Sequence, residues 1–430
     1  MHPISRSVHL SRLAAFYPDC RDCPLRTDTG QLPRQTVERL QNTERRVQRK
    51  SLLTDEGVRG VYLNELTRQK ADALASALAG LLWADAPLLG KTDARPRTGR
   101  TTGPSVVVGY DERTASPDIV TGVIAALLRM GCTVVDIAVT TRPCFCFTVA
   151  HVQASAGIFV TGAGCEPSWT GLDFVGRNAI PLSRGGELDR LEERLQHPIS
   201  RPTRRAGRHR TFQAVVPYEA GLWKHFHALR PLKIVYGCPS QLVCRSLERI
   251  FETLPCRLIS TDIPWRARNP LDQKDHDVVR LGETVRDAQA DLGVLIDDDG
   301  ARCGFVDEQG TAAQSQSITR LVAEMMLAEH PETAVVLEDS TFDALCGGIE
   351  ESGGRPVGSG SRFAEIAQTM RNEQALFGGG DSGRYWFSET FPTCDAVLTI
   401  AKVLNLLSRS DQPFSQVLEH VIEAADPQRP

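Results

Sequence analysis

The strongest constraint on the fold is a strand–helix–strand pattern in the first third of the chain. Residues 106–108 are three consecutive valines, a run typical of a buried strand. Ser116 followed by Pro117 predicts a helix with Ser116 as its N-cap, and Gly131 predicts its end. Residues 134–137 predict the next strand. Strands joined by a helix of this length pair in parallel with a right-handed crossover, so we expect an α/β fold.

The same pattern recurs twice further along the chain, and an amphipathic helix is predicted before it at residues 66–83. The predicted strand, helix and strand are 232–236, 241–253 and 256–259 in the first recurrence, and 334–337, 341–352 and 354–357 in the second. The Arg- and Pro-rich segment 198–210 predicts a linker between domains. Repetition over such long intervals favours successive α/β domains over a short-period solenoid.

Length and composition agree with this organisation and narrow the classes of function. A chain of 430 residues has room for roughly two to four domains, and 41% hydrophobic content suffices for their cores. The net charge of −4 gives no global attraction to nucleic acid or to a membrane, and we expect neither as a partner. The longest apolar run, residues 73–83, is far short of the ~20 residues that span a bilayer. With no secretory signal and scattered cysteines, we expect a cytoplasmic protein with free thiols.

Residues 1–50 predict a polar N-terminal extension in front of the α/β pattern. The part at 36–50 is rich in Arg, Glu and Gln and predicts a solvated helix that ends in a basic run. Cys20 and Cys23 form a C-x-x-C motif, which supplies half of a tetrahedral zinc site. His9 or a second chain would have to complete that site, and two free thiols in a loop are the simpler interpretation. We expect a protein partner, or self-association, to use this extension.

Five motifs follow one another between residues 57 and 384. They are G-V-R-G at 57–60 with E-L-T at 65–67, V-G-Y-D-E-R at 108–113 with S-P at 116–117, G-I-F-V-T-G-A-G-C-E-P-S-W-T-G-L at 157–172, D-L-G-V-L-I-D-D-D-G-A-R at 291–302, and A-L-F-G-G-G-D-S-G-R at 375–384. In order and spacing they resemble the motifs of the phosphohexomutase (phosphoglucomutase/phosphomannomutase) family. The resemblance implies three consecutive mutase-type α/β/α domains with mixed, largely parallel sheets. We expect these domains at 51–205, 206–312 and 313–430.

The family closes its cleft with a fourth domain that carries an R-x-S-G-T-x-P string for binding a phosphate. No such string follows Arg384, and only residues 385–430 come after it. From the resemblance we expect the fourth domain to be absent, or to be supplied by a separate polypeptide.

The third motif aligns without a gap with the family's G-I-x-V-T-A-S-H-N-P-x-x-W-N-G-L. The family's phosphoserine falls on Ala163 and its adjacent His on Gly164. Alanine has no oxygen to carry a phosphoryl group, and glycine has no side chain to transfer a proton. Thr161, Cys165 and Ser168 are nearby, but transfer needs a nucleophile in line with the leaving group. We therefore expect phosphoryl transfer to be lost, with no catalytic residue intact.

In the fourth motif, Asp297, Asp299 and Ala301 fall on the three aspartates that bind Mg²⁺ in the family. A hard divalent cation needs several anionic oxygens, and here one carboxylate and the phosphoserine oxygen are missing. Asp298 replaces a glycine of the family, but adjacent residues of an extended loop point in different directions. The resemblance therefore predicts a weak or absent magnesium site.

The fifth motif resembles the family's sugar-recognition loop, A-x-x-G-G-E-x-S-G-H. Gly380 replaces the Glu that accepts hydrogen bonds from sugar hydroxyls, and Arg384 replaces the His. Ser382 and Gly383 are kept, and Asp381 lies one place from the missing Glu. We expect this loop to bind a ligand with altered hexose selectivity.

Two further arginines join Arg384 as candidate phosphate-binding residues. Arg59 falls on the family Arg that faces the substrate phosphate, and a guanidinium suits phosphate through paired hydrogen bonds. Arg302 is kept from the fourth motif. Three arginines predict a cleft with a positive bias toward an anionic ligand.

These replacements lead to one preferred function and two alternatives. Family inheritance implies an intramolecular phosphotransferase, an isomerase of carbohydrate metabolism. The lost catalytic groups instead favour a pseudoenzyme that binds a sugar phosphate or a similar anion. The alternatives are residual or altered mutase activity, and a scaffold without a sugar-phosphate ligand.

Overall fold

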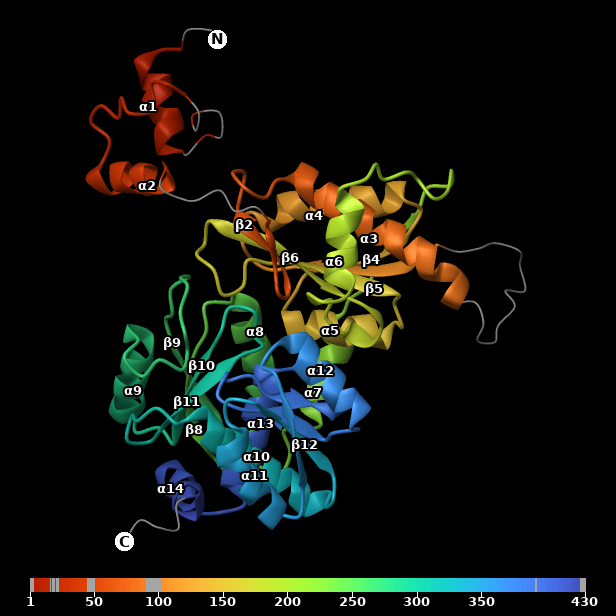
Figure 1. Ribbon diagram of the computed structural model, residues 1–430. Helices are drawn as coiled ribbons and strands as arrows, with labels where there is room; N and C mark the ends of the chain where they lie inside the picture. The colour runs from red at the N-terminus through yellow and green to blue at the C-terminus, as the bar shows by residue number, and fades with distance from the viewer. Residues whose placement is uncertain are drawn as a thin grey trace.

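The computed structural model describes residues 4–15, 17, 20, 23–44, 51–89, 103–390 and 393–425. Three sheets follow one another along the chain, each accompanied by helices (Figure 1). This confirms the expected fold class of consecutive α/β units with mixed sheets. The basic run 45–50 and the tail 426–430, both noted in the sequence, lie outside the described residues.

The first sheet has seven strands in the order β1-β2-β6-β5-β3-β4-β7. Its strands are β1 (Leu53–Thr54), β2 (Gly57–Val61), β3 (Ser105–Tyr110), β4 (Thr133–Val139), β5 (Ala156–Val160), β6 (Trp169–Val175) and β7 (Arg208–Thr211). Strand β3 pairs in parallel with β4 and β5, as the strand–helix–strand pattern predicted. Strand β6 pairs antiparallel with β5 and β2, which makes the sheet mixed.

Helices cover both faces of the first sheet. Val106 and Val108 of β3 point into a core formed with α3 (Arg68–Leu89), α4 (Ser116–Arg129) and α6 (Glu187–Leu195). Val107 points the other way, toward Phe145 of α5 (Arg142–His151). The valine run is buried on both sides because successive strand side chains alternate between the faces.

Two expectations about this unit are wrong. The N-cap of α4 is Ala115, and Ser116 is already helical; the Ser116 hydroxyl donates instead to Asp111 Oδ1 at 2.5 Å. The segment 198–210 is not a linker throughout, because β7 begins at Arg208 and pairs in parallel with β4. The first sheet thus continues beyond the expected boundary, and we propose that the first domain includes β7.

The second and third sheets have the orders β11-β10-β8-β9 and β13-β12-β14-β15-β16. The second unit contains α7 (Val215–Trp223), β8 (Lys233–Gly237), α8 (Gln241–Phe251), β9 (Arg257–Thr261), α9 (His276–Ala288), β10 (Leu292–Ile296) and β11 (Cys303–Asp307). The third contains α10 (Ser315–Glu329), β12 (Ala334–Glu338), α11 (Phe342–Glu351), β13 (Arg355–Ser359), α12 (Phe363–Asn372), β14 (Phe377–Gly379), β15 (Trp386–Phe387), β16 (Thr393–Cys394), α13 (Ala396–Ser408) and α14 (Phe414–Ala425). The strand–helix–strand segments predicted for both units are present within a few residues.

A single buried cluster joins the three units. It includes Phe145 from the first unit, Tyr236 from the second and Phe377 from the third. The units therefore pack directly on one another, and the loops at their strand ends are held in fixed relative positions.

The N-terminal extension contains α1 (Arg6–Ala14) and α2 (Arg34–Glu44), which lie beside each other in Figure 1. Leu13 and Leu40 are buried between them, and the Arg26 guanidinium donates to the Leu40 carbonyl at 3.0 Å. His9 Nε2 lies 3.0 Å from the carbonyl oxygen of Asp28. Within the described ranges, no helix combines the length and apolarity needed to cross a bilayer.

Candidate functional site

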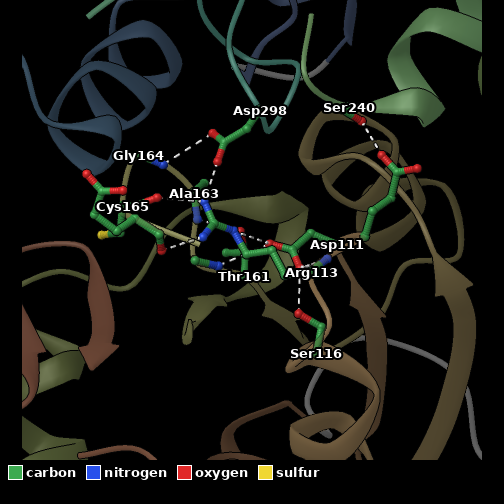
Figure 2. Close-up of polar contacts among 12 residues, drawn as sticks. Asp111, Arg113, Ser116, Thr161, Ala163, Gly164, Cys165, Ser240 and Asp298 are labelled. Atoms are coloured by element: carbon green, nitrogen blue, oxygen red, sulfur yellow. Dashed lines mark hydrogen bonds and ion pairs between the residues drawn. The ribbon is translucent and has the colours of Figure 1, made fainter. Parts of the chain in front are cut away.

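The motif loops meet where the three units pack together. The degenerate phosphoserine loop follows β5, the aspartate loop 297–302 follows β10, and the loop 380–385 follows β14. Figure 2 shows the first two of these loops joined by polar contacts. Loops at the carboxyl ends of parallel strands commonly form ligand sites in open α/β sheets, so this junction is the candidate site.

Two side-chain oxygens hold the backbone of the loop around Ala163. The Thr161 hydroxyl accepts a hydrogen bond from the Ala163 amide at 2.9 Å, and Asp111 Oδ2 accepts one from the Gly162 amide at 3.0 Å. Gly164 has φ of +73°, and a Cβ placed on it would meet nothing within 4 Å. The backbone at Gly164 is therefore open on the side where another residue would carry its side chain.

The Asp298 carboxylate accepts hydrogen bonds from this loop and from Arg113. Its Oδ1 accepts a hydrogen bond from the Gly164 amide at 3.2 Å, and its Oδ2 accepts one from Arg113 Nη2 at 2.6 Å (Figure 2). The carboxylate comes from the second unit, and both donors come from the first. The Asp298 carboxylate thus accepts hydrogen bonds from the donors that lie beside position 163.

Arg113 is a site residue that sequence reasoning missed. Its side chain is 3% exposed, and its guanidinium also donates to the carbonyl oxygens of Cys165 at 2.9 Å and Glu166 at 2.8 Å. It therefore ties the phosphoserine loop to Asp298. The sequence signal for it is the second motif, whose Arg lies at a strand-to-helix turn that opens onto the site.

The aspartate loop gathers three carboxylates in a small space. Ligand oxygens of Asp297, Asp298 and Asp299 all lie within 4.8 Å of one another, the one such cluster in the described part of the chain. Burial raises the pKa of Asp297 and of Asp299, and the negative charge of Asp298 raises both further. The C-x-x-C motif and His9 form no comparable cluster among the described residues.

This donor set does not fit the octahedral oxygen shell of Mg²⁺. Ala301 is 2% exposed and offers no side-chain ligand, while both oxygens of Asp298 are already engaged. Asp297 Oδ1 accepts from the Asp298 amide at 2.8 Å, and Asp299 Oδ1 accepts from the Ala301 amide at 2.9 Å. The loop hydrogen bonds thus use oxygens that a hard cation would need.

Glu338, at the end of β12, is hydrogen-bonded to the loop 380–385. Its carboxylate accepts hydrogen bonds from the amides of Asp381 at 3.1 Å and Ser382 at 3.0 Å, and from the Ser382 hydroxyl. A Cβ on Gly380 would lie 2.5 Å from the Glu338 Cβ. Glu338 therefore excludes any larger residue at 380, which is the position of the family's sugar-binding Glu.

The other residues of this loop differ in exposure, and Gly383 and Tyr385 are buried. Asp381 is exposed and its Oδ1 accepts from the Ser340 hydroxyl at 3.1 Å. Gly383 has φ of +72°, and its carbonyl oxygen accepts from the Cys303 amide at 3.0 Å. This bond joins the loop to the second unit.

Arg302 and Arg384 lie beside each other across a short antiparallel bridge. Arg302 Nε donates to the Ser382 carbonyl at 2.6 Å, and the Arg384 guanidinium lies 4.3 Å from the centroid of the Phe363 ring. Burial lowers the pKa of Arg302, and the neighbouring charge of Arg384 lowers it further. Among the residues that the structure describes, no carboxylate forms an ion pair with either arginine. Asp297, Asp299 and Glu338 lie near enough to oppose the lowering of the Arg302 pKa, so the two positive charges are only partly offset.

Arg59, by contrast, forms an ion pair with a carboxylate. Its Nη1 donates to Asp173 Oδ1 at 2.6 Å, and Asp173 also pairs with Arg142 at 3.3 Å. Arg142 in turn stacks 3.5 Å from the centroid of the Phe363 ring. The charge of Arg59 is balanced within the first unit, while Arg142 links that unit to the third.

Comparisons with known proteins agree with the motif assignments. Residues 50–198 match the family model of phosphoglucomutase/phosphomannomutase alpha/beta/alpha domain I, and residues 314–425 match that of domain III, together more than half of the chain. A phosphoglucomutase/phosphomannomutase of Thermococcus kodakarensis is 24% identical over 379 residues, which are 85% of this chain and 79% of that protein. A phosphomannomutase/phosphoglucomutase of Pseudomonas aeruginosa is 26% identical over 326 residues, 75% of this chain and 69% of that protein.

Solved structures show the same fold. A phosphoglucomutase/phosphomannomutase family protein of Burkholderia thailandensis superimposes with a TM-score of 0.74 at 21% identity, covering 86% of this chain and 79% of that one. A protein described as a phosphomannomutase from Thermus thermophilus gives a TM-score of 0.68 at 20% identity, covering 87% of this chain and 84% of that one.

Proposed function

The chain belongs to the phosphohexomutase superfamily, and we propose that it binds a sugar phosphate or a similar anion without transferring phosphate. The observation that carries this proposal is the contact of Asp298 with the Gly164 amide and Arg113. A phosphorylated side chain at position 163 would need these donors, and an internal carboxylate already holds them. We place the binding role in carbohydrate metabolism in the cytoplasm.

The chemistry of the loop supports a non-catalytic role. Ala163 has no nucleophilic oxygen, and the thiol and hydroxyls nearby belong to residues set in other positions of the loop. The aspartate loop lacks a carboxylate at Ala301, and both oxygens of Asp298 are engaged, which leaves fewer oxygen ligands for a magnesium ion. Removing a nucleophile or an electrostatic element each costs orders of magnitude in rate, and here both kinds are missing together.

The arginine pair supports the binding role. Two neighbouring guanidinium groups in a partly buried setting repel each other, and an anion between them relieves that repulsion. Phosphate, like carboxylate, accepts paired hydrogen bonds from guanidinium groups. Glu338 fills the space of the family's sugar-binding Glu, so the proposal requires recognition of the phosphate more than of the hexose.

Isothermal titration with glucose 1-phosphate and mannose 1-phosphate, with and without Mg²⁺, tests the binding role. We expect saturable binding that needs no Mg²⁺ and weakens about tenfold or more in Arg302→Ala and Arg384→Ala. Arg190→Ala is the matched control, because Arg190 pairs with Asp85 on an exposed surface at 3.0 Å. Absence of heat with both ligands would exclude this role and leave the scaffold alternative.

A coupled mutase assay on the same preparation tests the loss of catalysis. We expect no conversion of glucose 1-phosphate or mannose 1-phosphate to the 6-phosphate, with or without Mg²⁺ and a sugar bisphosphate activator. Turnover that scales with protein concentration and falls in Arg302→Ala would instead establish residual mutase activity.

A further inference from the structure

The turn between β8 and α8 brings two cysteines together beside the aspartate loop. Cys238 follows β8 and is 5% exposed, whereas Cys244 lies in α8 and is half-buried. The Cys244 sulfur lies 3.5 Å from the Cys238 carbonyl oxygen, and the neighbouring Cys238 thiol lowers the pKa of Cys244. We propose that Cys238 and Cys244 form a reversible disulfide when the protein meets a hydroperoxide.

Because Cys244 is more exposed than Cys238, the peroxide reacts first with Cys244. The Cys244 thiolate attacks one oxygen of hydrogen peroxide; a sulfur–oxygen bond forms, the oxygen–oxygen bond breaks, and water leaves after protonation. The Cys238 sulfur then attacks the Cys244 sulfenic acid, so that the sulfur–sulfur bond forms as hydroxide leaves and takes up the Cys238 proton. Two thiols and one peroxide thereby give one disulfide and two waters. An accessible thiol next to a resolving thiol is the usual arrangement of redox-sensitive cysteines.

Another close pair of cysteines lacks this arrangement. Cys144 and Cys146 both belong to α5 and are 1% and 3% exposed. A peroxide in solution reaches neither sulfur, and burial raises the pKa of both thiols, which disfavours the reactive thiolate. The pair at 238 and 244 combines contact with access.

The position of the turn connects the disulfide to the candidate site. The Cys238 sulfur donates to the Asp297 carbonyl at 3.5 Å. Within the same turn, the Ser240 hydroxyl donates to Glu112 Oε2 of the first unit at 2.7 Å (Figure 2). A sulfur–sulfur bond of about 2 Å draws Cys238 away from Asp297, because its thiol hydrogen is lost and its sulfur must approach Cys244. Oxidation therefore removes one support of the aspartate loop.

One tryptic peptide, residues 234–245, carries both cysteines, which makes the test direct. The intact protein is treated with hydrogen peroxide, unfolded, alkylated and digested. We expect this peptide to lose two hydrogens and to escape alkylation, and dithiothreitol to reverse both changes. We also expect severalfold faster amide hydrogen exchange in residues 297–302 of the oxidised protein. These readouts do not depend on ligand binding, so they stand apart from the proposed function.

Matched variants separate the pair from general thiol oxidation. In Cys244→Ser and in Cys238→Ser the loss of two hydrogens from this peptide should vanish, whereas Cys346→Ser, at another half-buried thiol, should leave it unchanged. Both thiols of the wild-type peptide remaining alkylatable after peroxide would overturn the proposal. So would oxidation of Cys244 to sulfinic acid with Cys238 still free.

Discussion

At the scale of single residues, the buried ion pair between Asp298 and Arg113 joins loops of two different units. The two side chains are 7% and 3% exposed, and their atoms lie 2.6 Å apart. A buried charge without its partner is costly, so each depends on the other. Asp298 stands where the family has a glycine, and its carboxylate pairs with an arginine of another unit.

Asp298→Ala should therefore destabilise the protein by about 1–3 kcal/mol, because the buried Arg113 would lose this hydrogen-bonded carboxylate and keep only Asp111, at 3.4 Å. Urea unfolding followed by circular dichroism measures the loss. Asp85→Ala, which breaks the exposed pair with Arg190, should cost under about 1 kcal/mol. Equal effects of the two substitutions would contradict the buried pair.

Glu338 should make stability depend on pH. Burial raises its pKa to about 7, above the value of about 4.3 for an unfolded Glu. The folded state thus holds this proton more tightly than the unfolded state. The stabilising contribution is complete below about pH 4 and is lost as the pH rises through 7, by at most about 1.4 kcal/mol per pH unit.

Glu338→Gln should flatten this dependence, since glutamine does not titrate. Urea midpoints at pH 5, 6 and 7 for the variant and the wild type give the difference, which should grow in favour of the variant with pH. Glu187→Gln, at an exposed position of α6, serves as the control with the wild-type profile. If the difference in urea midpoint between the wild type and Glu338→Gln stays constant with pH, Glu338 is not the group that makes stability depend on pH.

At the scale of elements, close backbone approach decides where glycine is required. A Cβ on Gly171 of β6 would lie 2.1 Å from the Val58 carbonyl of β2 and 2.8 Å from the Thr161 carbonyl. Neither carbonyl belongs to a flexible side chain that could move aside. This glycine lets the strand beside the phosphoserine loop lie flat against its neighbours.

Gly171→Ala should cost about 2 kcal/mol or more, because the strands must separate to admit a methyl group. Gly221→Ala, in α7 where a Cβ meets nothing within 4 Å, should instead stabilise by about 0.5–1 kcal/mol. Thermal and urea unfolding of both variants check the opposite signs. A stable Gly171→Ala protein would show that the strands can relax.

At the scale of the whole molecule, the ring of Phe363 joins the first and third units. It lies between the guanidinium groups of Arg142 and Arg384, at 3.5 and 4.3 Å from ring centroid to guanidinium carbon. The Phe363 amide also donates to Glu56 Oε1 at 2.5 Å. The candidate site is therefore formed by packing between units as much as by its own loops.

Phe363→Ala should lower stability by about 3–5 kcal/mol and let the first and third units move apart. Small-angle scattering should show a larger radius of gyration for this variant. Phe251→Ala removes a similar ring that stacks on Phe226 within the second unit, and should destabilise without expansion. Identical scattering of the two variants would show that Phe363 does not hold the units together.

The sequence by itself determined the order of the α/β units and the residues that stand at the family's motif positions. Valine runs, helix periodicity and ordered motifs are local patterns, and they placed Ala163, Gly164 and Ala301 without coordinates. Local pattern was also misleading at Ser116, because the periodicity does not reveal the side-chain bond to Asp111, five residues earlier. The Arg-rich composition near residue 208 concealed β7, because pairing with β4 depends on a distant strand.

Only the tertiary structure decided which charges are balanced and which are free. Asp298 meets Arg113 across 185 positions of sequence, and Glu338 meets Ser382 across 44. Arg59 is neutralised by Asp173, while Arg302 and Arg384 have no such partner among the described residues. The reason is physical: motifs and periodicity encode neighbours along the chain, whereas the partner of a buried charge is fixed by how separate units dock.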